Sequence, residues 1–362
     1  MSDDKVKILF IMVNNPGVSY YRFYQFAQRL SELNLAHCRM FPEWDTDKFQ
    51  GPFWEDNLDN YLPMLDDMVN WADFVVIQYI STAQGLCLVE AIRDKKPCFC
   101  EVDDYLSQVP YYSISYDDNK PGERQDVWAT RQIIESKGVV TTTNYLKKHF
   151  SQWNSNIYVI PNCIDFEAWD KLKSHSNEKV RIGWIGGDTH YGDLKLIQNV
   201  LYEVLEKYEN TEVYIVMGNP PAWKPHPRLK MLSKWVRIDE YPRHFKDLSF
   251  DIGLAPLRDN FFNRGKSNLR YLEYSACKIP TVASNVEPYR QDFQGFLAEN
   301  DDQWFNQISQ LVESLDYRLA SGWKAYYDVK DKFDINVGTS KYIQMIREQV
   351  CPVTHVENAA RL

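Results

Sequence analysis

Residues 251–284 read DIGLAPLRDNFFNRGKSNLRYLEYSACKIPTVAS, and this stretch decides the fold class. The apolar run at 252–257 predicts a buried strand, and the apolar run at 279–283 predicts a second one. Between them, residues 267–277 have the amphipathic spacing of a helix. The order of strand, loop, helix and strand is typical of an α/β fold built on a parallel sheet.

The loop ahead of the predicted helix carries the chemistry. Ser267 and Asn268 are both candidates for the helix cap. A helix N-terminus presents unpaired N–H groups and the positive end of a dipole, so it favours a phosphate. Four cationic side chains, Arg258, Arg264, Lys266 and Arg270, surround this point in the sequence. Together these features predict a site for a diphosphate.

Glu273 extends this hypothesis along the helix. At about 3.6 residues per turn, it lies on roughly the same face as Ser267 and Arg270. Its carboxylate could accept hydrogen bonds from ribose hydroxyls, so the helix would hold a nucleotide sugar at both ends. The alternative is an ordinary βαβ unit with a capped helix and a basic surface loop.

Residues 272–284, LEYSACKIPTVAS, resemble the phrase LEAMACGTPVVAS of retaining GT-B glycosyltransferases, the family-4-like group that uses nucleotide-diphosphate sugars. The family pattern has an earlier Glu where this chain has Gly265, and here a Lys266–Ser267 pair follows, as in a known variant. Residues 159–165, VIPNCID, resemble the phrase VIPNGVD that ends the first domain of the family. The loop GGDTH at 186–190 matches the place where the second domain approaches the donor. The resemblance favours the donor site over the ordinary βαβ unit.

The resemblance implies an α/β protein of the GT-B fold, with two doubly wound Rossmann-like domains that face a central cleft. Residues 1–170 would form the acceptor-side domain, and residues 178–335 would form the donor-binding domain. Residues 336–362 would form a C-terminal helix that packs back on the first domain.

The site roles follow from the resemblance and from the predicted strand ends. Asp103 and Asp104 come directly after a predicted strand at 97–102, where sites of open α/β sheets lie. Each could instead be a turn or cap residue. The predicted donor-binding residues are Gly186, Gly187, Ile238, Tyr241, Arg258, Lys266, Ser267, Asn268 and Glu273. The predicted acceptor or cleft residues are Gly17, Tyr21, Arg22, Gln78 and Asp104. The predicted catalytic residues are Asp103, Lys266 and Arg264, of which the two cations would stabilise the leaving group.

Some of these residues have a plain alternative. Arg22 could be a solvated side chain at a helix start, and Gln78 stands where family members often have a His. The fold that the chain resembles is independent of metal ions, so we expect neither a metal nor a cofactor. The co-substrate would be a UDP- or GDP-linked sugar, and the acceptor a saccharide or a modified DNA base.

Composition limits the function classes. The chain has 362 residues, enough for two domains. Its net charge of −9 disfavours a protein that coats nucleic acid through its overall field. Cys98 and Cys100 lie in an apolar run, so we interpret them as buried free thiols and infer a reducing compartment. No signal peptide or run of ~18 apolar residues is visible, which predicts a cytoplasmic protein without a transmembrane segment.

Two other functions remain open at this point. Residues 223–237 combine basic residues with two tryptophans, which favours either a groove for a nucleic acid strand or a solvated helix anchored by tryptophan. The first reading would make the chain a glycosyltransferase that modifies hydroxylated bases in DNA. The earlier Glu that is missing motivates a third reading, a sugar-nucleotide-binding protein without catalysis.

The remaining elements are predicted from apolar periodicity. Strands are expected at 7–13, 73–80, 139–143, 157–160, 180–185, 212–217, 235–239 and 296–298. Helices are expected at 20–33, 62–71, 84–93, 124–136, 145–153, 193–208, 301–315 and 339–350.

Overall fold

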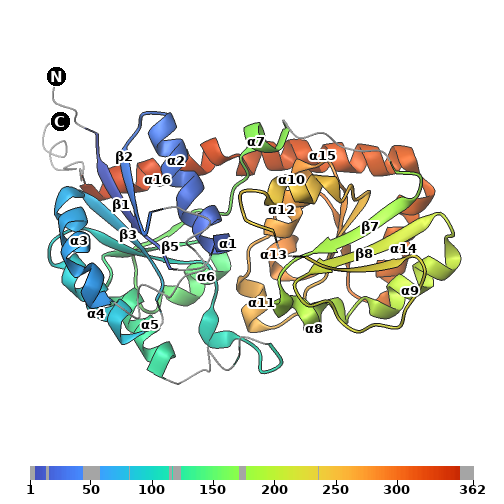
Figure 1. Ribbon diagram of the computed structural model, residues 1–362, viewed down its shortest axis with the longest axis horizontal. Helices are drawn as coiled ribbons and strands as arrows, with labels where there is room; N and C mark the ends of the chain where they lie inside the picture. Colours follow the sequence, from blue (N-terminus) through green and yellow to red (C-terminus); the bar gives the residue numbers. More distant parts are fainter. Residues whose placement is uncertain are drawn as a thin grey trace, which may run out of the picture.

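A computed structural model describes residues 5–13, 16–43, 58–80, 82–113, 116, 124–170, 177–234 and 236–350. Within these residues the chain forms two six-stranded sheets, each flanked by helices, and Figure 1 shows them side by side. The strand order is β2-β1-β3-β4-β5-β6 in the first sheet and β12-β11-β10-β7-β8-β9 in the second. Every pair of neighbouring strands is parallel, so all carboxyl ends of a sheet lie at one edge.

The first sheet forms from short apolar runs that helices cover on both faces. All five residues of β3, FVVIQ, are buried, as expected for a central parallel strand. The strands are β1 Lys7–Ile11, β2 His37–Phe41, β3 Phe74–Gln78, β4 Cys98–Val102, β5 Gly138–Thr141 and β6 Ile157–Val159. The helices are α1 Pro16–Ser19, a π-helical turn at Tyr20–Tyr24, α2 Gln25–Glu32, α3 Leu58–Trp71, α4 Ala83–Arg93, a 3₁₀ turn at Leu106–Gln108, α5 Arg124–Glu135, α6 Asn144–Phe150 and α7 Phe166–Asp170.

The second sheet repeats this plan. Its strands are β7 Val180–Ile185, β8 Thr211–Met217, β9 Leu229–Ser233, β10 Ile252–Ala255, β11 Thr281–Ser284 and β12 Phe296–Ala298. Its helices are a 3₁₀ turn at Asp188–His190, α8 Tyr191–Leu194, α9 Gln198–Lys207, α10 Tyr241–Asp247, α11 Phe261–Gly265, α12 Leu269–Ala276, α13 Glu287–Arg290, α14 Asp301–Glu313 and α15 Leu315–Phe333.

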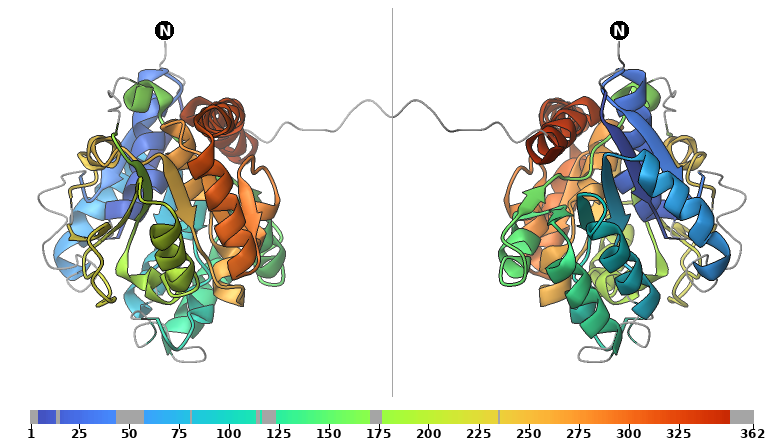
Figure 2. Two further views of the ribbon diagram at one scale, coloured as in Figure 1. Left: turned by 90° about the vertical axis from the view of Figure 1, so that its right-hand side faces the viewer. Right: turned by 90° about the vertical axis from the view of Figure 1, so that its left-hand side faces the viewer.

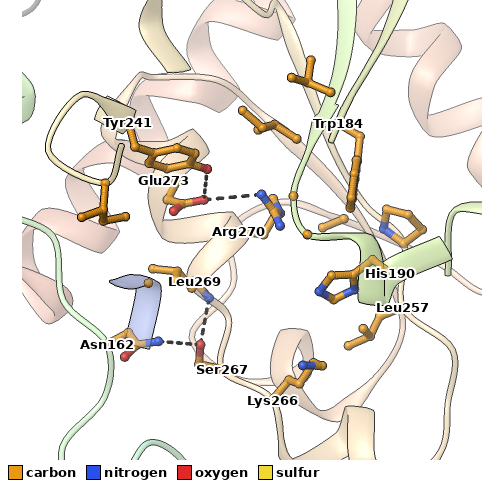
Figure 3. Close-up of a pocket in the computed structure, with 18 of the residues that line it drawn as sticks. Asn162, Trp184, His190, Tyr241, Leu257, Lys266, Ser267, Leu269, Arg270 and Glu273 are labelled. Atoms are coloured by element: carbon orange, nitrogen blue, oxygen red, sulfur yellow. Dashed lines mark hydrogen bonds and ion pairs between the residues drawn. The ribbon is translucent and has the colours of Figure 1, made fainter. Parts of the chain in front are cut away.

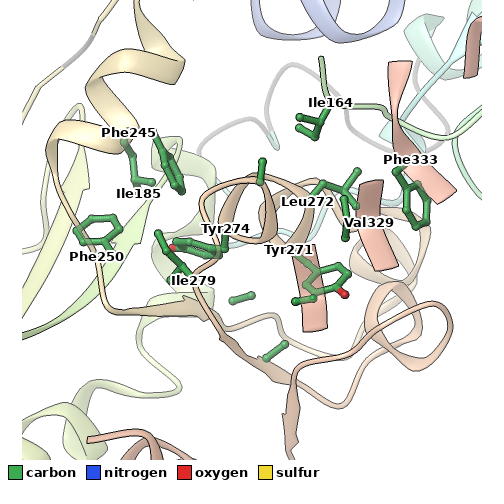
Figure 4. Close-up of a cluster of buried hydrophobic side chains, with 14 of the residues drawn as sticks. Ile164, Ile185, Phe245, Phe250, Tyr271, Leu272, Tyr274, Ile279, Val329 and Phe333 are labelled. Carbon is green, nitrogen blue, oxygen red and sulfur yellow. The ribbon is translucent and has the colours of Figure 1, made fainter. Parts of the chain in front are cut away.

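Helix α12 is the best-anchored element near the gap between the sheets. Figure 4 shows its tyrosines and Leu272 in a cluster with Phe245 and Phe250. The hydroxyl of Tyr274 donates to the carbonyl of Gly183 at 2.9 Å. A Cβ on Gly253 would lie 2.5 Å from the Tyr274 ring, so glycine permits this close approach of helix and strand. The packing fixes the face of α12 that carries Glu273.

Helix α16, Ile335–Val350, crosses back to the first half of the molecule (Figures 1 and 2). Asp334 separates it from α15 in an extended conformation. Tyr342 is fully buried, with its ring 5.9 Å from that of Phe10 and 5.1 Å from that of Phe26. The doubly wound architecture and the returning helix are therefore confirmed, while the exact domain boundaries at 170, 178 and 336 stay predictions.

Four local expectations were wrong. Residues 229–233 form the edge strand β9 rather than part of a helix, and residues 236–239 form no strand. The predicted helix at 193–208 is broken at 195–197. Strand β2 was missed, because HCRMF at an edge has no clear apolar period. Cys98 and Cys100 are buried free thiols, as expected.

Candidate active site

A cavity of about 800 Å³ lies between the two halves. Its walls come from residues that follow strands β1, β4, β6, β7 and β10, because parallel strands present their carboxyl ends there. Figure 3 shows most of the lining side chains. The lining includes ten predicted site residues, namely Gly17, Asp103, Asp104, Gly186, Gly187, Ile238, Tyr241, Lys266, Ser267 and Glu273.

The residues at the start of α12 line the cavity from the second half. The Lys266 ammonium lies 3.2 Å from the Asp104 carboxylate and 4.4 Å above the Phe262 ring. The Ser267 hydroxyl accepts a hydrogen bond from the Asn162 amide at 2.8 Å and a long one from the Leu269 N–H at 3.4 Å. The side chain of Asn268, at the N-cap position, makes no capping bond, so the long hydrogen bond to Ser267 is the one that these two side chains give to the start of α12.

Glu273 is a buried carboxylate, 3% exposed, that lines the cavity. It accepts hydrogen bonds from the hydroxyls of Tyr21 at 2.9 Å and Tyr241 at 3.1 Å. The Arg270 guanidinium lies 3.6 Å away. Burial raises the pKa of Glu273, and the charge of Arg270 acts against that rise. Each carboxylate oxygen has two lone pairs, so Glu273 retains capacity to accept further hydrogen bonds.

The loop after β7 brings backbone close to the same space. A Cβ on Gly187 would meet nothing nearer than 3.9 Å, whereas one on Gly186 would lie 2.5 Å from the Arg270 guanidinium. The guanidinium also sits 5.3 Å over the ring of Trp184. Gly187 therefore leaves open room for a ligand, and Gly186 leaves room for Arg270.

Asp193 holds this loop to the segment after β10. Its Oδ1 accepts from the backbone N–H of Arg258 at 2.8 Å and from the Asn263 amide at 3.1 Å. Its Oδ2 lies 2.9 Å from Nδ1 of His190. Burial lowers the pKa of His190, although Asp193 counteracts this. Asp193 thus positions the cavity wall from behind.

The first half contributes a wall with carboxylates. Gly17, Asp103, Asp104 and Asn162 line the cavity from this side. Burial, followed by the charges of Asp104 and Glu101, raises the pKa of Asp103 to about 8.

Six predicted residues do not line the cavity. Arg264 is 38% exposed and pairs with Asp259 at 2.5 Å, because the short helix α11 turns it outward. The Arg258 guanidinium donates to the carbonyl of Gly192 at 2.8 Å. The other four are Asn268, Tyr21, Arg22 and Gln78.

Arg22 and Gln78 have structural contacts within the first half, whereas the Tyr21 hydroxyl donates across to Glu273 in the second half. Arg22 is 1% exposed and pairs with Glu101 at 2.6 Å, so it is neither solvated nor in the cleft. It also donates to the Asn162 side-chain oxygen at 3.0 Å. Gln78 accepts from the N–H of Val13 at 3.0 Å, which holds the loop after β1. Tyr21 reaches Glu273 as described above.

Several lining residues were not predicted as site residues: Asn162, Trp184, His190, Lys234, Arg237 and His244. Asn162 carried a usable signal, because it follows β6 within the phrase VIPNCID. Arg270, which was expected only to add charge near the helix start, also lines the cavity. Arg228 does not contribute to a basic patch at 223–237. Its guanidinium donates to the backbone carbonyls of Leu205, Tyr208 and Thr211.

Among the residues that the structure describes, no group of three or more His, Cys, Asp or Glu side chains is arranged to hold a metal ion. No helix in the described ranges is both long and apolar enough to cross a membrane.

Comparison with known proteins identifies the fold. No family model and no curated protein sequence matches this chain. Sucrose-phosphate synthase from Thermosynechococcus elongatus aligns over 96% of this chain and 100% of its own, with TM-score 0.69 and 13% identity. HepE from Anabaena, in complex with UDP and glucose, aligns over 95% and 100%, with TM-score 0.65 and 13% identity. The trehalose-6-phosphate synthase OtsA aligns over 92% and 83%, with TM-score 0.58 and 14% identity. These neighbours are GT-B glycosyltransferases, and the chain has the GT-B fold.

Proposed function

We propose that this protein is a glycosyltransferase that moves a sugar from a UDP- or GDP-linked donor to a hydroxyl acceptor, with retention of configuration. The observation that carries the proposal is the alignment of Lys266, Ser267 and Glu273 along the start of α12, inside a cavity between two parallel sheets. A structural neighbour of the same fold is in complex with UDP and glucose, which supports a nucleotide-diphosphate donor.

The donor would lie along the wall of the second half. Glu273 would accept hydrogen bonds from the ribose, and Lys266 and Arg270 would meet the diphosphate. Gly187 would allow the backbone to approach the ligand, because no side chain fills the space beside it. The base would then lie against Ile238 and Tyr241, which line the adjoining part of the cavity.

Catalysis would be mainly electrostatic. Lys266 and Arg270 would stabilise the negative charge that develops on the departing diphosphate, and Arg270 is held in place over the Trp184 ring before the reaction. In the family that the sequence resembles, the departing phosphate assists the incoming hydroxyl, so no enzymic nucleophile is assigned. Asp103 would orient the acceptor hydroxyl from the opposite wall. No metal ion is assigned a part, and we expect EDTA to leave the rate unchanged.

Turnover tests the proposal directly. Purified protein should release UDP or GDP from one member of a nucleotide-sugar panel above the rate without enzyme. Proton NMR of the product should show the same anomeric configuration as the donor. An inverted product would contradict retention alone. Binding without any release of nucleotide would favour the non-catalytic alternative.

A further inference from the structure

The two walls of the cavity carry opposite charges. Among the described lining residues, every lysine and arginine comes from the second half, namely Lys234, Arg237, Lys266 and Arg270. The first half contributes Asp103 and Asp104 instead. Glu273 is the one further lining carboxylate in the described part of the chain, and its charge is matched by Arg270. Within the described lining, a ligand that spans the cavity therefore meets cations at one end and the two aspartic carboxyl groups at the other.

Arg22, a cation of the first half whose charge acts on Asp103, is already engaged. Arg22 is buried against Glu101, 2.6 Å away, and also donates to Asn162. The Asp103 carboxyl lines the cavity and accepts no hydrogen bond from any described residue. Burial, followed by the charges of Asp104 and Glu101, raises the pKa of Asp103 to about 8, so near neutral pH its carboxyl is largely protonated and can still accept a hydrogen bond at its carbonyl oxygen. The negative charge of this wall therefore comes from Asp104, which pairs with Lys266.

The single ion pair that joins the two walls in the described cavity is between Lys266 and Asp104, at 3.2 Å. Lys266 belongs to the segment that would bind the donor diphosphate. A diphosphate carries more negative charge than one carboxylate, and it can accept several hydrogen bonds from one ammonium. Donor binding would therefore draw Lys266 away from Asp104 and leave that carboxylate facing the remaining space.

We propose that the acceptor is an uncharged polyol whose hydroxyls donate to Asp103 and Asp104, and that the donor's diphosphate makes Asp104 available by taking Lys266 from it. This inference rests on the proposed function and names the acceptor class of the same site. A phosphorylated sugar would place like charges together in a partly buried space, which opposes binding. Binding of DNA is opposed for the same reason, because its phosphodiester backbone is negatively charged.

The first arm of the test measures UDP affinity by calorimetry. Asp104→Asn removes the competitor for Lys266, so the variant should bind UDP about twofold to fivefold more tightly than the wild type. Asp259→Asn is the matched control, because Asp259 pairs with Arg264 outside the cavity, and its UDP affinity should be unchanged. Unchanged or weaker binding by Asp104→Asn, with UDP bound by the wild type, would overturn the inference alone. Absence of UDP and GDP binding by the wild type would remove the proposed function as well.

The second arm tests the acceptor class. Wild-type protein saturated with UDP is heated with and without millimolar glucose 6-phosphate, and with inorganic phosphate in parallel. Because a ligand that binds the native state raises the melting temperature, neither anion should raise it further. A rise with either anion would show a cationic acceptor site and contradict the proposal.

Discussion

Asp103 is a carboxyl in the cavity whose pKa is raised mainly by burial. Its folded-state pKa is raised from 3.8 to about 8, so between these values the folded protein holds a proton that the unfolded chain has released. Stability from this group is therefore present at low pH and declines as pH rises through that window. Asp103→Asn keeps the neutral form at every pH.

The free energy of unfolding of Asp103→Asn, measured with denaturant, should rise relative to that of the wild type as the pH is raised from 5 to 8. The reason is that folding of the wild type requires Asp103 to take up a proton over this range, whereas the asparagine of the variant has no proton to take up. A difference that stays constant over that range would show that Asp103 titrates normally.

For single residues, local chemistry could be predicted from the sequence, but tertiary partners could not. Lys266, Ser267 and Glu273 line one cavity as the sequence led us to expect, because cap chemistry and helical spacing are local properties. Arg258 and Arg264 have the same local character, yet the carbonyl of Gly192 and the carboxylate of Asp259 hold them elsewhere. Those partners are set by tertiary packing, which one sequence does not display.

At the scale of elements, a substitution in the loop after β7 can separate an effect on stability from an effect on ligand affinity. Gly187 has φ −77°, a conformation that alanine adopts readily, and its Cβ would point into open space. Gly187→Ala should therefore keep or raise the free energy of unfolding by about 0.4–1 kcal/mol, through a less flexible unfolded chain. The methyl group should nevertheless lower UDP affinity.

Thermal unfolding without ligand and UDP titration check this prediction. Gly186→Ala is the informative comparison, because its Cβ would displace the Arg270 guanidinium. That variant should lose both stability and affinity. Unaltered UDP binding by Gly187→Ala would mean that the donor does not approach this loop.

The strands that were not predicted share one physical cause. Long apolar runs such as β3 were predicted correctly, because a strand covered on both faces must be apolar throughout. The edge strands β2 and β9 are only partly buried, so their sequences contain polar residues and lack that signal. Tryptophan and lysine in the segment around β9 favoured a helix in the sequence analysis. In the structure, this segment instead pairs with β8.

At the scale of the whole molecule, α16 fastens the end of the chain to the first half. The Tyr342 ring is fully buried between α2 and β1, while its hydroxyl has no hydrogen-bond partner among the described residues. Tyr342→Ala should lower the free energy of unfolding by about 3–5 kcal/mol. Tyr342→Phe should keep it or raise it by about 1 kcal/mol, since an unsatisfied buried hydroxyl is removed.

Chemical denaturation of the two variants separates ring packing from the hydroxyl. Gln344→Ala, on the exposed face of α16, serves as a control and should change stability little. Comparable losses in Tyr342→Phe and Tyr342→Ala would show that the hydroxyl has a partner that stabilises the fold.

The central claim is that the start of α12, facing the gap between the sheets, binds the diphosphate of a nucleotide sugar. Calorimetric titration of UDP- and GDP-sugars into the wild type, Lys266→Ala, Glu273→Gln and Arg264→Ala tests it most directly. We predict binding of at least one donor, weakened about tenfold or more in Lys266→Ala and Glu273→Gln, where charged hydrogen bonds are lost, and unchanged in Arg264→Ala. Equal affinity in all four proteins, or no binding of any nucleotide sugar by the wild type, would contradict the account.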